Sequence, residues 1–275
     1  MCLLGFAITA SGLSLAIITL CSGQWQWSHV AIFVGTYFAV SSAITVIYHR
    51  YGTHDAFTFT RVGRWLARPL FLIAACYAWQ GQFSFWCAAH RQHHLHTDEP
   101  GDPHSPYCQH GSWRKRIFQF LWAHMWWIPH TQPDVKSFLK THNADWLERL
   151  VSRWYVYLLV GPVSAMTLTW LIGGWQGCAW YLAAVFIYWH MTACVNSLTH
   201  LVGRRRFVTK DNSRNSSLLA LFTLGEGWHN NHHRYPRSPR FAWGLWEYLL
   251  DIGWWEIWLM QRLGLVKRVY LPSGN

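Results

Sequence analysis

The sequence predicts an all-α integral membrane protein: four transmembrane helices in two hairpins, and a cytoplasmic helical cap that holds a metal site. Hydrophobic residues make up 52% of the 275-residue chain and charged residues only 13%, against roughly 25% charged residues in soluble globular proteins. The charges are also segregated, because no Lys, Arg, Asp or Glu occurs in residues 1–49 or 154–203. Many of the 17 histidines gather beside these two uncharged blocks.

Each uncharged block is long enough for two membrane spans of about 20 residues joined by a short turn. Turns are expected around residues 23–28 and 173–177, where Gly, Ser and Gln interrupt the apolar runs. The four expected spans are residues 2–21, 30–48, 155–171 and 179–195. The chain is therefore predicted to form one integrated domain of two transmembrane hairpins and two cytoplasmic segments, in the order 1–49, 50–153, 154–203 and 204–275.

The orientation of these spans follows from the basic residues. All 23 Lys and Arg residues lie in the two segments outside the uncharged blocks, and cytoplasmic loops of membrane proteins are rich in Lys and Arg. We therefore expect a multi-pass protein with both termini and its active site on the cytoplasmic side. The net charge of +11 is better explained by anionic lipid and an acidic partner than by nucleic acid, for which the chain shows no binding module.

Two further apolar stretches are interrupted by polar residues and are not expected to cross the membrane. Residues 66–89 contain Arg68 and Gln80, and residues 242–263 alternate Trp with Glu and Asp. If residues 66–89 crossed, the histidines after them would face away from those before them. Each stretch is therefore predicted to form a helix at the cytoplasmic interface.

Nine histidines in four clusters are the candidate metal ligands. Two of the clusters share the pattern H-x-x-H-H, and residues at i, i+3 and i+4 lie on one face of a helix. Neighbouring histidines diverge by about 100° on a helix, so that one can serve each of two nearby metals. The clusters are His49 and His54 in HRYGTH, His90, His93 and His94 in HRQHH, His200 in NSLTH, and His229, His232 and His233 in HNNHH.

The residue types near the clusters narrow the choice of metal site. The seven cysteines are scattered and form no C-x-x-C pair, which disfavours iron–sulfur and structural zinc sites. Carboxylates are scarce, which disfavours the Glu-x-x-His sites of ferritin-like bundles. A histidine-rich, redox-active di-iron centre remains, and its expected work is to activate dioxygen against an unactivated C–H bond. The carboxylates considered as candidates near the clusters are Asp55, Asp98, Asp102 and Glu226.

The remaining histidines are expected to play structural roles. His96 and His104 lie near the clusters in sequence and are predicted to support the site without binding metal. The others are expected to pack at the membrane interface or to cap helices: His29, His110, His124, His130, His142 and His190.

Taken together, these motifs resemble the membrane fatty acid desaturase superfamily, specifically its Δ9-type acyl desaturases of the bacterial and cyanobacterial kind. The resemblance covers roughly residues 30–272. It rests on YHRYGTH, on WCAAHRQHH followed by HTDEPGDPHSP, on VNSLTHLVG, on DNSRN and on GEGWHNNHHRYP.

The resemblance implies a cofactor, a reaction and a location. The nine histidines would bind two irons, and Asn196 would reach one iron through a water molecule. Similar proteins use dioxygen and two electrons to place a cis double bond, here expected at Δ9, in an acyl chain held in a bent tunnel. Trp79, Phe83 and Trp86 are the aromatic residues expected to line that tunnel. A bacterial inner membrane is the expected location.

The sequence departs from its relatives at a few positions. Asp55 stands where Arg is common, and Gly52 where a larger side chain is usual. Ala88 and Ala89 replace charged residues that help to hold the CoA head group in the animal acyl-CoA enzymes. Acyl-CoA, an acyl-lipid and an acyl carrier protein therefore all stay open as the substrate.

Alternative functions and the electron donor also stay open. A fatty acyl hydroxylase or an acetylenase would use the same scaffold, and a haem- or metal-handling membrane protein is a more distant alternative. The chain carries no fused electron carrier, so a ferredoxin, a rubredoxin or a cytochrome b5 would supply electrons. The basic runs Arg204–Arg206 and Arg114–Arg116 would dock an acidic donor or contact lipid.

Overall fold

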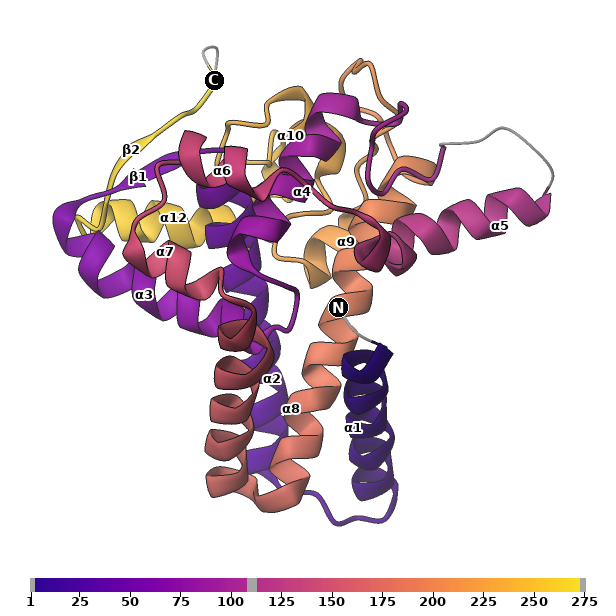
Figure 1. Cartoon of the computed structure of the whole chain (residues 1–275), viewed down its shortest axis with the longest axis vertical. Helices are drawn as coiled ribbons and strands as arrows, with labels where there is room; N and C mark the ends of the chain where they lie inside the picture. Colours follow the sequence, from indigo (N-terminus) through magenta and orange to yellow (C-terminus); the bar gives the residue numbers. More distant parts are fainter. Residues whose placement is uncertain (1–2, 108–112, 273–275) are drawn as a thin grey trace.

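The computed structural model describes residues 3–107 and 113–272 and divides into a stem and a cap (Figure 1). The stem consists of α1 (Leu3–Cys21), α2 (Trp27–Ser42), the first part of the π-helical η1 (Ala43–Thr53), η4 (Val156–Val160) and α8 (Gly161–Leu201). The connection between α1 and α2 lies at the far end of the stem, and the cap contains the remaining described residues. This arrangement confirms the mostly helical class and fits an integral membrane protein.

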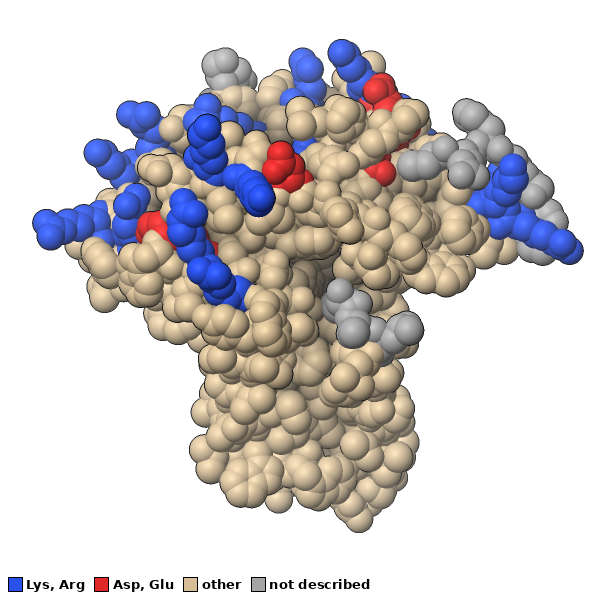
Figure 2. All heavy atoms as spheres, viewed as in Figure 1, with Lys and Arg blue, Asp and Glu red and all other residues tan. Residues whose placement is uncertain are grey.

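The stem helices have the length and composition of membrane spans. Three helical stretches are long and apolar enough to cross a bilayer, namely Leu4–Cys21, Trp27–Thr53 and Val156–Leu201. Their outward side chains are large hydrophobic residues such as Ile18, Val34 and Leu171. The visible face of the stem carries no charged residue, whereas Lys and Arg side chains are spread over the cap (Figure 2). A surface of this kind suits lipid and not water.

The helix α8 folds back on itself at a pair of glycines. Gly173 and Gly174 leave helical geometry, with φ/ψ of −137°/17° and 61°/−154°. The Sγ atom of Cys178 lies 3.3 Å from the carbonyl oxygen of Met166, although twelve residues would span about 18 Å in a continuous helix. α8 is therefore a helical hairpin, whose two arms are seen side by side in Figure 1. Its turn falls where the sequence predicted one.

Close helix contacts and a histidine hold the stem together. α8 packs against both α1 and α2. A Cβ atom on Gly12 would come within 2.2 Å of Leu182, so a small residue permits the close approach. The Nε2 atom of His29 lies 3.1 Å from the Gly173 carbonyl oxygen, and its Nδ1 accepts from the Gln26 backbone N–H at 3.1 Å. This histidine caps a helix and ties together the turns of the two hairpins, as its predicted structural role requires.

The prediction of one interfacial helix over residues 66–89 is wrong, because the segment is divided between two helices. The structure has α3 (Arg61–Tyr77) and α4 (Phe83–His96), separated by residues 78–82. Trp79 and Gly81 adopt positive φ values of 53° and 100°, and a left-handed backbone ends a right-handed helix. This break redirects the chain, so that α4 carries the H-R-Q-H-H cluster into the cap.

The second predicted interfacial helix, residues 242–263, is also divided. It consists of α11 (Leu245–Leu250) and α12 (Ile252–Arg262), with Asp251 between them. The carboxylate of Asp251 accepts hydrogen bonds from the backbone N–H groups of Phe241, Ala242 and Trp254. Asp251 also pairs with buried Arg50. Because its carboxylate must reach these partners, α11 ends at this residue and α12 begins after it.

The rest of the cap consists of short helices and one strand pair. β1 (Phe57–Phe59) and β2 (Val266–Val269) are antiparallel, with Phe57 opposite Val269 and a bulge after Thr58. This small sheet departs from the all-α prediction and fastens the C-terminal segment to the cap. The other elements are α5 (Trp113–Leu121), η2 (Trp122–Trp126), η3 (Ile128–His130), α6 (Val135–Thr141), α7 (Trp146–Val151), α9 (Ser217–Phe222) and α10 (His229–Arg234).

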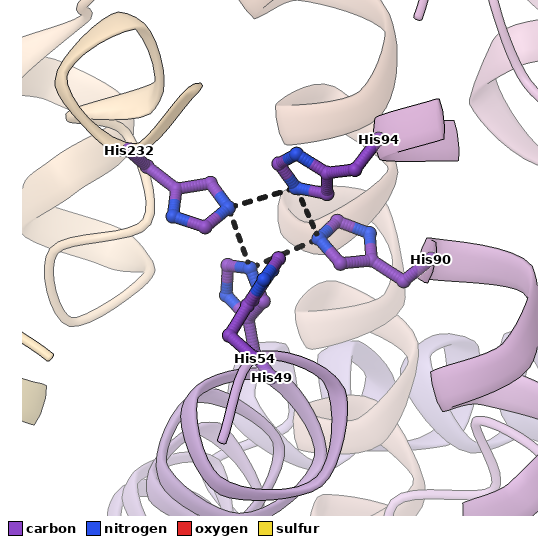
Figure 3. Close-up of side chains that lie close together, drawn as sticks. All are labelled: His49, His54, His90, His94 and His232. Carbon is purple, nitrogen blue, oxygen red and sulfur yellow. Dashed lines mark hydrogen bonds between the residues drawn. The ribbon is translucent and has the colours of Figure 1, made fainter. Parts of the chain in front are cut away.

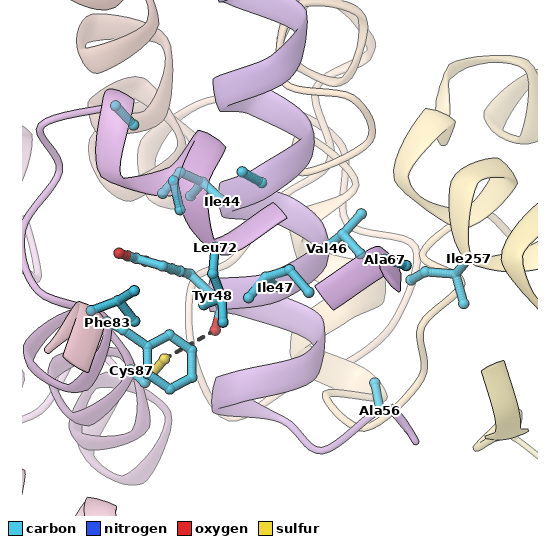
Figure 4. Packing of buried hydrophobic residues seen from close by; sticks show 14 of the residues in the cluster. Ile44, Val46, Ile47, Tyr48, Ala56, Ala67, Leu72, Phe83, Cys87 and Ile257 are labelled. Carbon is cyan, nitrogen blue, oxygen red and sulfur yellow. Dashed lines mark hydrogen bonds between the residues drawn. The ribbon is translucent and has the colours of Figure 1, made fainter. Parts of the chain in front are cut away.

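The main hydrophobic core lies where η1 enters the cap (Figure 4). Tyr48, Phe83 and Cys87 are fully buried there, and the Cys87 thiol donates to the Tyr48 carbonyl oxygen at 3.2 Å. A Cβ atom on Gly52 would lie 2.6 Å from the Phe83 ring and 2.8 Å from the Cys87 Sγ atom. The glycine is therefore matched to a tightly packed core in this chain.

A buried ionic network joins the helices of the cap. Arg68 donates to Glu148 at 2.8 Å and to Asp145 at 2.5 Å. The His142 Nδ1 atom lies 3.2 Å from an Asp55 oxygen, and its Nε2 lies 3.7 Å from Glu148. Burial alone would lower the pKa of His142, but the hydrogen bonds to Asp55 and Glu148 outweigh it and raise the pKa to about 9.

This network predicts a loss of stability at alkaline pH. Because the pKa of His142 is raised on folding, its stabilisation is complete below about pH 6.5 and is lost as the pH rises through about 9. The melting temperature of the protein in detergent should fall over this window. The His142→Gln variant should show a smaller fall, and an equal fall in both proteins would show that the histidine does not contribute.

Candidate metal centre

The four histidine clusters meet inside the cap at the top of the stem. η1 supplies His49, and His54 follows it directly; α4, the end of α8 and α10 supply the others. Both H-x-x-H-H clusters lie on helices, as predicted. The nine histidines form two groups, in each of which the ligand atoms lie within 4.8 Å of one another: His49, His54, His90, His94 and His232 in the first, and His93, His200, His229 and His233 in the second.

The first group directs its ring nitrogens at a common centre (Figure 3). The Nε2 atom of His49 lies 2.9 Å from that of His90 and 3.0 Å from that of His232. The Nε2 atom of His94 closes the ring at 3.2 Å from His90 and 2.9 Å from His232. The fifth member, His54, has a buried Nε2 atom with no hydrogen-bond partner among the described residues.

Hydrogen bonds between the neutral rings cannot account for all of these short Nε2–Nε2 contacts. A neutral imidazole carries one N–H and one lone pair. The Nδ1 atom of His49 contacts the Glu226 carboxylate, so its proton lies on that side and its Nε2 presents a lone pair to two neighbouring Nε2 atoms. Several lone pairs converging in a buried space are stabilised by a cation at their centre. The donor set therefore fits a metal that binds imidazole.

Carboxylates fix the ring orientation in the second group. A metal-binding histidine usually donates its other N–H to a carboxylate or a carbonyl group. In the second group, three histidines contact a carboxylate through Nδ1: His93 with Asp102 at 2.9 Å, His200 with Asp98 at 3.1 Å, and His233 with Asp211 at 3.0 Å. The Nε2 atoms of His93 and His233 are buried without a hydrogen-bond partner among the described residues, and so are free to bind a metal.

Burial keeps the site in its ligating protonation state. Desolvation, reinforced by neighbouring histidines, holds the pKa values of His90, His94 and His232 well below the usual range. These rings are therefore neutral at pH 7, which is the form that binds metal. Burial raises the pKa of Asp102 to about 7. For Asp211, hydrogen bonds from His233 and Ser213 outweigh burial and hold its pKa below the usual range.

The carboxylates are the part of the site that the sequence predicted least well. Asp98, Asp102 and Glu226 contact candidate ligand histidines. Asp55 does not, because its side chain is 51% exposed and pairs with Arg91 and His142. Asp211 was not among the residues predicted from the sequence. Its signal is the D-x-S of DNSRN, in which Asp211 accepts from the Ser213 backbone N–H at 2.9 Å and so forms a rigid turn.

A buried arginine supports Glu226 from behind. Arg50 is fully buried and donates to Asp251 and to Thr45, both at 2.8 Å. Its Nη1 atom lies 3.3 Å from a Glu226 oxygen. A Cβ atom on Gly253 would lie 1.9 Å from the same nitrogen, so α12 can approach Arg50 only through a glycine. This series of contacts links α12 to His49 through Asp251, Arg50 and Glu226.

The other histidines of the described residues lie outside the two groups. His104 stacks on His93 with ring centroids 4.2 Å apart and lies with Asp102 in a third small cluster, which matches its predicted supporting place beside the site. The Nε2 of His124 lies 3.0 Å from the Nδ1 of His190. The Nδ1 of His130 contacts the Trp126 carbonyl oxygen. His110 lies outside the described residues.

Two narrow cavities, of about 30 and 50 Å³, lead from the first group toward the stem. The inner one contacts His49, His90 and His229, and the outer one is lined mostly by apolar side chains. Trp86, Thr192 and Asn196 line both, so the cavities adjoin.

Of the three aromatic residues predicted to line a tunnel, Trp86 lines both cavities. Trp79 and Phe83 are not among the lining residues of either cavity. Trp79 instead donates to the Tyr181 hydroxyl at 3.0 Å, and Phe83 packs in the core of Figure 4.

The fold and the site define a helical membrane protein with a buried two-metal candidate centre that opens into an apolar cavity. Comparison with known proteins makes this more specific. The family model described as fatty acid desaturase matches residues 25–260, and the chain belongs to this family. It is an oxidoreductase, and the resemblance found in its motifs is confirmed.

Three relatives indicate the Δ9 type. The chain is 35% identical over 259 residues to the sn-2 palmitoyl-lipid 9-desaturase of Nostoc sp. (strain 36), covering 89% of this chain and 82% of the relative. It is 31% identical over 264 residues to the sn-1 stearoyl-lipid 9-desaturase of Anabaena variabilis, covering 94% and 90%. It is 34% identical over 258 residues to Delta-9 acyl-lipid desaturase 1 of Arabidopsis thaliana, covering 92% and 78%.

Proposed function

We propose that this enzyme places a cis double bond at Δ9 in the acyl chain of a membrane lipid, using two irons, dioxygen and two electrons from a separate donor. The observation that carries the proposal is the convergence of nine histidines, in two groups, at the inner end of an apolar cavity. The names of the three relatives, all acyl-lipid desaturases, favour a lipid-bound acyl chain over acyl-CoA or an acyl carrier protein.

We assign one iron to each histidine group. The first would be held by His49, His54, His90, His94 and His232, and the second by His93, His200, His229 and His233. Asn196 lies one helical turn before His200 and lines both cavities, which supports its predicted contact with an iron through water. The bound irons would activate dioxygen, which is the oxidant: it would take two hydrogens from neighbouring methylene groups together with two electrons and two protons, and leave as two water molecules.

The protein's own contribution is to hold one pair of methylenes in place. The Nε2 of Gln80 donates to the Thr192 hydroxyl at 3.0 Å, which pairs two polar groups of a mostly apolar wall. Trp86 stacks on His90 with ring centroids 5.1 Å apart, so the acyl chain would be fixed directly against a ligand ring. Holding one methylene pair at a fixed position, with water excluded, determines which bond of the acyl chain reacts.

We propose that the stem crosses the membrane four times, as two hairpins with the cap and both termini in the cytoplasm. Support comes from the fold-back of α8 and from the α1–α2 turn, which lies at the same end of the stem (Figure 1). The Lys and Arg residues lie at the opposite end, on the cap (Figure 2), as the positive-inside rule requires. A bacterial inner membrane is the proposed location.

The test is expression in a host that cannot make unsaturated fatty acids, followed by gas chromatography–mass spectrometry with double-bond derivatisation. A new monounsaturated acid with its bond at carbon 9, absent with His232→Ala, is the expected result. A hydroxylated acid or an acetylenic acid would contradict desaturation and favour the two alternatives on the same scaffold. Lipid classes are separated before analysis at successive times after induction, and a new unsaturated acid that appears first in CoA esters would contradict the acyl-lipid assignment.

A further inference from the structure

A polar groove opens the metal centre to the side of the cap that faces away from the stem. It has a volume of about 430 Å³ and is bounded by the end of α4, the loop at residues 208–211 and the end of α10. Its wall contains His94 from the first histidine group and His233 from the second. The apolar cavities reach the centre from the stem side, so the groove and the cavities approach it from different directions.

We propose that this groove is the docking site of the electron donor, an acidic protein that carries one electron at a time. The inference rests on the proposed function, which needs two electrons from outside the chain. A donor seated here would be one imidazole ring away from either iron without disturbing the acyl chain. At each encounter the reduced carrier loses one electron and the metal centre gains one, so two encounters supply the reaction.

The rim of the groove has the chemistry of a transient protein contact. Leu95 and Val208 line it with 77% and 93% of their surface exposed, a high value for apolar residues outside the stem. Lys210 and Arg234 carry two exposed positive charges against the one exposed carboxylate of Glu99. The Asp211 carboxylate is charged but only 11% exposed, and it faces His233 and Ser213 inside the wall. Small apolar contacts ringed by charge suit short-lived redox complexes, and complementary charge speeds their formation.

The basic run Arg204–Arg206 assists this surface indirectly. Arg205 donates to the carbonyl oxygens of Thr209 and Asp211, at 3.0 and 2.8 Å, and so shapes the 208–211 loop. Arg206 is paired with Glu247 at 2.8 Å. We therefore place the donor contact at the loop of residues 208–211, which Arg205 stabilises, and not at the Arg204–Arg206 run itself.

The test is stopped-flow reduction of the purified, iron-loaded enzyme by a pre-reduced acidic [2Fe–2S] ferredoxin at low ionic strength. Val208→Glu and Lys210→Glu should each lower the second-order rate constant by about tenfold or more, because they oppose an acidic partner. Iron content and reduction by dithionite, a small molecule that needs no docking surface, should stay unchanged. For the wild type, the rate constant should fall as salt is added.

Two control variants make the same chemical changes elsewhere on the cap. Leu245→Glu alters an apolar residue that is 79% exposed on α11, and Lys267→Glu alters an exposed lysine of β2; both should react at the wild-type rate. Equal slowing by test and control variants would overturn the docking site, as would unchanged rates with Val208→Glu and Lys210→Glu. Wild-type enzyme that dithionite reduces but the ferredoxin does not would overturn the acidic partner. Failure of the wild type to bind iron would instead overturn the proposed function.

Discussion

Replacing either His232 or His93 by alanine is expected to abolish formation of the unsaturated product. His232 presents its Nε2 to those of His49 and His94 at 3.0 and 2.9 Å, so its loss opens the first group. His93 is fully buried and is held by Asp102 at 2.9 Å, so its loss opens the second. Changes even to the partners of metal ligands typically cost 10–100-fold, and loss of a ligand itself should cost more.

The matched control for this prediction is His130→Ala, which makes the same chemical change at an exposed position. The His130 ring contacts only the Trp126 carbonyl oxygen among the hydrogen bonds of the described residues. This variant should retain wild-type turnover and iron content. Product yield is measured by gas chromatography–mass spectrometry, alongside the amount of folded protein in the membrane. Full activity of His93→Ala or His232→Ala would contradict the assignment of two irons to the two groups.

Glu226→Gln is expected to weaken the first metal site by about 10–100-fold, the usual effect of losing a carboxylate behind a ligand histidine. Among the described residues, Glu226 is the one carboxylate that contacts a ring nitrogen of the first group, whereas the second group has three. A neutral amide fixes the His49 tautomer less firmly and removes a negative charge facing Arg50, which lies 3.3 Å away. Iron affinity and turnover should fall, while the second site keeps its metal.

Glu256→Gln provides the control for this second prediction. Glu256 is likewise a buried carboxylate bonded to a hydroxyl group, that of Ser42 at 2.5 Å. Among the hydrogen bonds and ion pairs of the described residues, Glu256 makes no contact with any of the nine histidines. Iron titration of both variants should separate them. Equal iron affinity in Glu226→Gln and Glu256→Gln would contradict a positioning role for Glu226.

Local patterns in the sequence predicted the features that depend on local physics. The absence of charge in residues 1–49 and 154–203 located the stem helices, because burying a charge in lipid is costly whatever the fold. The glycines at 173 and 174 located the turn of the second hairpin. The H-x-x-H-H spacing located two helices whose histidines share a face, because that follows from 3.6 residues per turn.

Features that depend on distant partners were not predictable in the same way. The break at Asp251 exists because Arg50, some 200 residues earlier, needs a buried counter-charge. The strand pair joins residues 57–59 to residues 266–269, and neither segment has a strong strand pattern alone. Asp55 looked like a candidate because it follows a histidine cluster, yet its backbone leaves the helix with φ of 47° and turns it toward Arg91.

The count of iron ions bound per chain tests the central claim most directly. Protein purified without oxygen from iron-supplied cells, or reconstituted with ferrous iron, is measured by inductively coupled plasma mass spectrometry against quantitative amino-acid analysis. Two separate histidine groups predict two irons per chain at saturation. Saturation at one iron per chain, or no retained iron in folded protein, would contradict the two-metal centre.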